Sequence, residues 1–180
     1  MSGAVDVKFE CSEALAMLDR ISRKGINAVP LMRDISRIMH DAVEENFEKE
    51  GRPKWKALAA STIRNRRRKG NWPGRILTGS RGRLANSIQQ SYSATSAVVG
   101  TNVKYARIQQ LGGTIRHAAR ERIMHFGKNK KFAKPKKASY GMKSQGKAYG
   151  STIPARPFLR LEPSDGRRIL EAARRFLLDR

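Results

Sequence analysis

Residues 30–47, PLMRDISRIMHDAVEENF, are the segment from which the architecture of this chain is best predicted. Apolar side chains recur in it every three or four residues, which places them on one face of an α-helix. Pro30 suits the first turn of a helix, where a backbone N–H would have no helical partner. Gly51 and Pro53 then end the element. The apolar face of this long amphipathic helix carries Leu31, Ile35, Ile38, Met39, Ala42, Val43 and Phe47.

Shorter predicted elements flank this helix. They are a helix capped by Ser12, a basic helix from Ser61, a hairpin over 92–101, a helix over 105–111 closed by Gly112-Gly113, and a final helix capped by Ser164. Their order predicts a single α+β domain over residues 1–180. It has N-terminal helices, a small antiparallel sheet, a long basic loop or arm, and a C-terminal helix.

The expected core extends beyond the helices. Val98 and Val99 form its central strand, and Tyr105 and Leu111 are expected to be buried against that strand. Residues 114–126 are interpreted as a strand pair with Ile115 and Ile123 facing inward.

Residues 127–150 contain hardly any aliphatic side chain. Such a segment buries too little apolar surface to offset the entropy lost when it is ordered. The sequence therefore predicts a mobile basic loop or arm here, ordered only by a partner.

The charge is distributed very unevenly along the chain. The formal net charge is +23. Residues 1–50 contribute −3 and residues 162–180 contribute +1, whereas residues 51–161 hold 26 basic side chains and one carboxylate, Glu121. Internal ion pairs cannot neutralise this middle segment, so its partner is expected to be nucleic acid or an acidic protein face.

Two basic runs are the candidate contacts with DNA or with an acidic partner. They comprise Arg64, Arg66, Arg67, Arg68 and Lys69, and then Lys128, Lys130, Lys131, Lys134, Lys136 and Lys137. Consecutive arginines on a helix point in all directions, so they suit contacts with the DNA backbone rather than base reading. The alternative for both runs is a solvated basic surface.

An acidic face is expected on the long helix. Asp41, Glu44, Glu45 and Glu48 follow helical spacing and form either a solvated face or a patch for a basic neighbour. We take Glu44, Glu45 and Glu48 as assembly candidates, because a second copy offers the basic segment needed for head-to-tail association.

The sequence offers little catalytic chemistry. Three histidines and one cysteine do not make a familiar zinc site, and neither a phosphate-binding loop nor a nucleophile triad can be assembled. No enzyme activity, cofactor or metal is expected. No apolar run reaches the length of a membrane span, and no secretory signal opens the chain, so a soluble intracellular product is expected.

Several segments together resemble a known family. In order they are Trp55-Lys-Ala-Leu58, Ile76-Leu-Thr-Gly79, Val99-Gly-Thr101, Tyr105-Ala106, Gln109-Gln-Leu-Gly-Gly113 and Ile153-Pro-Ala-Arg-Pro-Phe-Leu159. This ordered set is similar to the phage virion morphogenesis family, which is related to the tail-completion and neck proteins of Mu-like and P2-like phages. The resemblance covers about residues 30–180. One departure is that Gln109-Gln110 stands where the family usually has a histidine.

The resemblance implies a structural protein without catalysis, located in the virion after assembly in the host cytoplasm. It implies a homo-oligomeric ring at the head–tail junction (neck, tail completion or tail terminator) that joins capsid to tail around the DNA channel. The implied partners are other neck and tail proteins, with non-specific proximity to DNA and no membrane. Arg156 and Phe158, fixed by two prolines, belong either to a core-return segment or to an assembly contact. The alternative function is that of a sequence-nonspecific nucleic-acid-binding protein.

Overall fold

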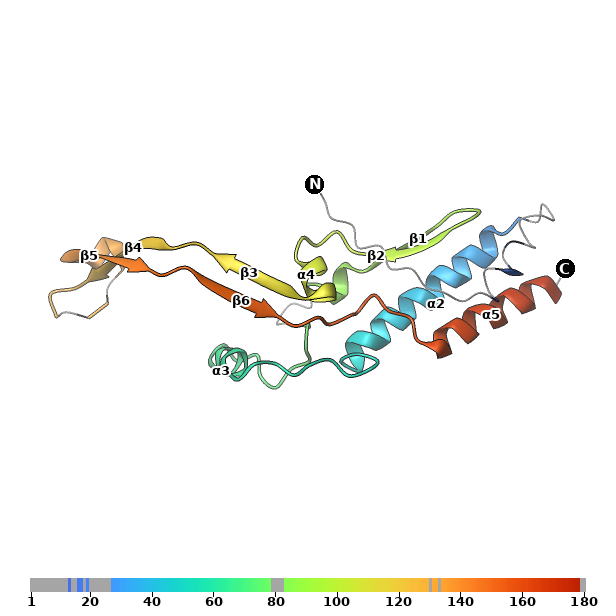
Figure 1. Ribbon diagram of the computed structural model, residues 1–180, viewed down its shortest axis with the longest axis horizontal. Coiled ribbons are helices and arrows are strands. Elements are labelled where there is room, and N and C mark those ends of the chain that lie inside the picture. The colour runs from blue at the N-terminus through green and yellow to red at the C-terminus, as the bar shows by residue number, and fades with distance from the viewer. Residues whose placement is uncertain are drawn as a thin grey trace. The chain divides into compact units, whose positions relative to one another are not determined.

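The computed structural model describes residues 27–78, 83–129, 131–132 and 134–178, together with Glu13, Ala16, Met17 and Asp19. The chain forms two compact units, whose elements are labelled in Figure 1. The helical unit comprises 1–112 and 154–180, and the ribbon unit comprises 113–153. The helix expected after Ser12 lies largely outside the described residues. Whether the two units fold together as one domain stays a prediction.

The predicted long helix is α2, Val29–Glu48, with a proline in its first turn. It lies beside α5, Pro163–Leu178 (Figure 1). Leu31, Met32 and Ile35 of α2 pack with Ile169 and Ala173 of α5 in one buried cluster. Each helix covers the apolar face of the other, which explains why both amphipathic patterns are readable from the sequence.

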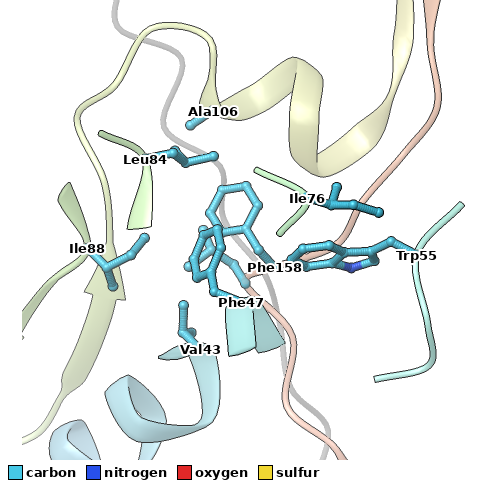
Figure 2. Packing of buried hydrophobic residues seen from close by; sticks show 9 residues of the cluster. Val43, Phe47, Trp55, Ile76, Leu84, Ile88, Ala106 and Phe158 are labelled. Atoms are coloured by element: carbon cyan, nitrogen blue, oxygen red, sulfur yellow. The ribbon is translucent and has the colours of Figure 1, made fainter. Parts of the chain in front are cut away.

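A second core lies at the end of α2 and gathers aromatic rings from distant parts of the chain (Figure 2). The rings of Phe47 and Trp55 meet edge to face with centroids 5.9 Å apart, and Phe47 and Phe158 lie 5.3 Å apart. Gly51, at φ +97°, turns the chain between α2 and Trp55, and a Cβ there would come within 2.4 Å of the indole. The rest of the cluster is Val43, Ile76, Leu84, Ile88, Ala106 and Leu159.

The remaining elements of the helical unit are short. They are α3 (Ala60–Arg68), a 3-10 turn at Ala85–Ser87, β1 (Gln89–Tyr92), β2 (Ala97–Gly100) and α4 (Ala106–Leu111). Strands β1 and β2 pair antiparallel, with Gln89 opposite Gly100 and Tyr92 opposite Ala97. The predicted hairpin is therefore confirmed, although its first strand begins earlier than expected.

Three predicted core residues of this unit are exposed: Val98, Tyr105 and Leu111. Because side chains alternate along β2, Val98 faces away from the half-buried Val99. The helix α4 buries Ala106 and Gln110, which are four residues apart, so the adjacent Tyr105 and Leu111 lie off its buried face. The core assignment was wrong at these positions.

The ribbon unit consists of two antiparallel strand pairs. Strand β3 (Gly113–His117) pairs with β6 (Tyr149–Ile153), and β4 (Arg120–Phe126) pairs with β5 (Tyr140–Gly146). The predicted strands over 114–126 exist, but each pairs with a later strand rather than with the other. Ile115 and Ile123 are exposed, so their inward placement was wrong.

Residues 127–150, expected as a basic loop or arm, instead contain β5, the start of β6 and a 3-10 turn at Pro135–Lys137, whereas their mobility stays a prediction. Pairing with β4 gives the backbone of β5 its hydrogen bonds without an aliphatic core. The prediction had considered only the small apolar surface that this segment can bury. The α+β class is confirmed. Its strands form three separate two-stranded sheets in the described part of the chain.

Candidate functional site

The segment that returns from the ribbon unit is held by two buried amide side chains. The Oε1 atom of Gln110 accepts from the backbone N–H groups of Phe158 (2.9 Å) and Leu159 (3.0 Å), and its Nε2 donates to the Leu159 carbonyl (3.1 Å). Asn46 Nδ2 donates to the carbonyls of Phe158 and Arg160. These bonds satisfy backbone groups that have no partner in a strand, so Gln110 holds the return segment in place. The sequence analysis did not identify this role of Gln110.

Arg156 is also buried in this segment. Its guanidinium donates to the carbonyl of Lys56 (3.0 Å from Nη2) and, at 3.4 Å, to that of Ala57. Burial lowers the pKa of Arg156, and the charge of Arg66 lowers it further. Phe158 is fully buried. Of the two interpretations of this proline-rich motif, the structure matches the core-return segment: both side chains contact their own chain.

A charge network joins the end of α2 to the start of α5. Arg52 lies 2.8 Å from the buried carboxylate of Asp165 and 2.7 Å from Glu45. Lys49 also donates to Glu45. The pKa of Glu45 is lowered, mainly by the hydrogen bond from Lys49. Desolvation opposes this effect, the charges of Arg52 and Lys49 lower the pKa further, and the charge of Asp165 raises it slightly. Glu45 is thus engaged within its own chain, whereas the side chains of Glu44 and Glu48 are exposed.

The acidic face of α2 is partly neutralised. Asp41 lies 3.8 Å from Arg168, and Glu44 lies 3.9 Å from His40. His40, Asp41 and Glu44 present ligand atoms within 4.8 Å of one another, which is geometrically compatible with a cation. These pairings account for their proximity, and nothing else about the cluster points to a metal.

The basic helix predicted from Ser61 is α3, which buries none of its residues. Arg66 is engaged within the chain, donating to the carbonyl of Arg75 at 3.0 Å. Arg64, Arg67 and Lys69 are exposed, and their side chains form no hydrogen bond or ion pair with the described part of the chain. Arg68 is exposed too and donates to Asn65. Apart from Arg66, this run is a solvent-facing basic surface.

Near the second basic run in the sequence lies an aromatic cluster formed by the half-buried Phe126 and the exposed Phe132 and Tyr140. The ring of Phe126 lies 5.0 Å from that of Phe132 and 5.5 Å from that of Tyr140, both stacked. Phe132 is 77% exposed. The neighbouring cations are exposed as well: Lys128, Lys131, Lys134, Lys136 and Lys137, with Lys130 outside the described residues. Sequence reasoning missed this cluster, because Phe126 and Tyr140 meet only through the β4–β5 register.

The ribbon unit carries a large excess of positive charge. Residues 113–153 hold eleven Lys and Arg side chains and one carboxylate, Glu121. No ion pair forms among the described residues of this unit. Across the described part of the chain, no helix is long and apolar enough to cross a membrane.

Comparison with known proteins identifies the family of this chain. The profile of the phage virion morphogenesis family matches residues 9–178. The Mu-like prophage FluMu G protein 2 of Haemophilus influenzae is 35% identical over 159 residues, covering 88% of this chain and 85% of the relative. The putative capsid assembly protein G of Escherichia phage Mu is 35% identical over 118 residues, covering 63% and 72%. No solved structure matches. This chain belongs to the phage virion morphogenesis family and is a structural, non-enzymatic protein of a bacteriophage virion.

Proposed function

We propose that copies of this chain form a ring at the head–tail junction, as a neck, tail-completion or tail-terminator layer that joins capsid to tail around the DNA channel. The observation that carries the proposal is the ribbon unit: eleven cations against one carboxylate, with an uncovered aromatic cluster among the lysines. A surface of this kind needs partners of two sorts, an apolar protein surface and a polyanion.

The aromatic cluster supports an assembly role. Phe132 and Tyr140 stand exposed on the ribbon unit, and Met142, two residues after Tyr140 on β5, is exposed as well. Aromatic and methionine side chains with a charged rim are typical of the centre of a protein–protein interface. The partner protein is expected to offer an apolar hollow edged by carboxylates, which pair with Lys128, Lys131, Lys134, Lys136 and Lys137.

Contacts between copies can use charge as well. Glu44 and Glu48 face solvent on α2, and Arg64 and Arg67 face solvent on α3. These residues provide the acidic and basic surfaces that head-to-tail association in a ring requires. Glu45 takes part less readily, because Lys49 and Arg52 already pair with it.

A role beside DNA is supported by the same charge excess. The exposed lysines and arginines attract the phosphate backbone without reading the base sequence, which suits a channel through which DNA must move. A second candidate function, a sequence-nonspecific nucleic-acid-binding protein, is favoured by the +23 net charge alone.

Cryo-EM of virions, together with native mass spectrometry of the purified chain, tests the ring. The expected result is a closed oligomer and matching density between capsid and tail. A matched pair of variants, Phe132→Ser at the aromatic cluster and Val98→Ser on the exposed face of β2, tests the interface. We expect only Phe132→Ser to prevent head–tail joining when each variant complements a phage lacking this protein. Monomers at every concentration and no density at the junction would instead favour the second candidate function.

A further inference from the structure

A groove lies along one face of the ribbon unit, where the two strand pairs adjoin. The β4–β5 register puts Arg120, Arg122 and Met124 on one face of β4, and Glu121 and Ile123 on the other. The groove encloses about 470 Å³ and is lined by His117, Ala118, Arg120, Arg122, Met124, Ser144, Gly146, Lys147 and Tyr149. Its walls therefore come from β3, β4, β5 and β6, and the connections between them.

The charged side chains that line this groove are all cationic. Arg120, Arg122 and Lys147 are all exposed, and none has an ion pair or side-chain hydrogen bond with another described residue. Glu121 is the only carboxylate between residues 51 and 161, and strand alternation turns it to the opposite face. Three unpaired cations thus share one hollow from which the nearby negative charge is excluded.

The shape of the groove leaves these cations accessible. Ser144 and Gly146 lie opposite Arg122 and Arg120 across the strand pair, so small side chains face the long ones. The rings of His117 and Tyr149, which both line the groove, stack with centroids 4.4 Å apart. The groove is thus lined by cationic, aromatic and small side chains, and Met124 is the single large aliphatic side chain among its lining residues.

We propose that this groove binds the phosphate backbone of duplex DNA without reading its sequence. The guanidinium groups of Arg120 and Arg122 match phosphate with paired donors, and Lys147 adds a point charge. The hydroxyls of Ser144 and Tyr149 are of the kind that also contact phosphate oxygens. A two-stranded ribbon is narrow enough to approach a DNA groove. The proposal rests on the proposed function only in taking DNA as the polyanion that passes the protein.

The groove and the aromatic cluster of the ribbon unit suit partners of different chemistry. An acidic protein surface would be held best where apolar side chains can be desolvated, and Phe126, Phe132 and Tyr140 meet that need while the groove does not. The groove residues and the cluster share one face of the β4–β5 pair but lie toward its opposite ends, so we expect them to take separate partners. This division predicts that equal losses of charge at the two places have unequal effects on DNA binding.

Two triple variants with the same charge loss test the division in the full chain. The groove variant is Arg120→Gln, Arg122→Gln and Lys147→Gln, and the control is Lys134→Gln, Lys136→Gln and Lys137→Gln. Binding to a fluorescein-labelled duplex of about 30 base pairs is followed by anisotropy from roughly 50 to 200 mM NaCl. Each phosphate contact contributes about 0.9 to the slope of log K against log salt. We expect the groove variant to lose about 2–3 in slope and the control less than about 1.

A further variant separates charge from misfolding. Arg120→Lys with Arg122→Lys keeps both charges, so it should retain most of the slope while weakening binding several-fold, and its circular dichroism should match the wild type. Equal slope losses in the two triple variants would overturn the proposal in favour of a diffuse field. Wild-type binding to polyglutamate but not to the duplex would overturn it in favour of an acidic protein. Neither result bears on whether virions contain the ring, which is tested separately by imaging.

Discussion

Replacing Phe158 by alanine tests the placement of the second core. Its side chain is completely buried and its ring lies 5.3 Å from that of Phe47. A phenyl ring that buries on the order of 150 Å² contributes about 4 kcal/mol at roughly 25 cal/mol per Å². The cavity left behind is closed only in part, so the expected loss in the free energy of unfolding is about 3–5 kcal/mol.

Leu111→Ala is the matched control, because Leu111 is also a large apolar residue close to this segment but is 57% exposed. Its loss should stay within about 0.5 kcal/mol, as for other surface substitutions. Urea unfolding followed by far-UV circular dichroism, at concentrations where the chain is monomeric, gives both values from the midpoints and slopes. A Leu111→Ala variant as unstable as Phe158→Ala would refute the burial pattern of α4 and the return segment.

Three further predictions concern Gln110, the charge network and the ribbon unit. Gln110→Ala leaves the buried N–H groups of Phe158 and Leu159 without acceptors, so urea unfolding should show a loss of about 2–4 kcal/mol. Gln110→His, whose ring offers one acceptor and one donor, should recover part of that loss. The pKa of Glu45 is lowered in the fold, so its stabilisation is present above its ordinary pKa of 4.5 and lost as the pH falls through the folded value. Glu45→Gln should therefore lose less Tm than wild type between about pH 6 and pH 3. Replacing residues 114–152 by a short Gly-Ser linker joins two residues that are already strand partners, so calorimetry should find the Tm of the helical unit changed by only a few degrees. A large drop would mean that the two units fold as one.

The helices were predictable because their signal is local. The apolar residues of α2 and α5 repeat with the helical period, and each helix has the other to cover that face. The glycine stop after α4 was equally readable: Gly112 and Gly113 both take positive φ, which other residues rarely adopt. The order of these local signals along the chain also allowed the family to be recognised, as the profile match confirms.

The strand pairing was not predictable in the same way. Alternation over residues 114–126 indicates strands but not their partners, and β3 pairs with a strand more than thirty residues away. The register therefore determines which side chains meet, as with Phe126 and Tyr140 or Met124 and Met142. Composition predicted the charge of the ribbon unit correctly while missing both its aromatic cluster and its groove.

The burial of particular polar residues was also not predicted from the sequence. Gln110 stands beside the exposed Leu111, and hydropathy alone ranks them in the wrong order. The readable clue is helical spacing, because Gln110 lies four residues after the buried Ala106. For Arg156 the clue is weaker, since only the folded chain brings the carbonyls of Lys56 and Ala57 to its guanidinium.

If the proposed partners bind the ribbon unit, its stability should depend on them. Two-stranded pairs without a covering layer are marginal in water, and this unit adds the mutual repulsion of eleven cations. Its aromatic stack offsets part of this cost, but the rings remain open to solvent on the outer side. A polyanion in the groove would relieve the repulsion, and a protein over the Phe126, Phe132 and Tyr140 cluster would complete the burial. The two partners would therefore stabilise the same strands from two places, and occupancy of one would favour the other wherever both depend on the β4–β5 register.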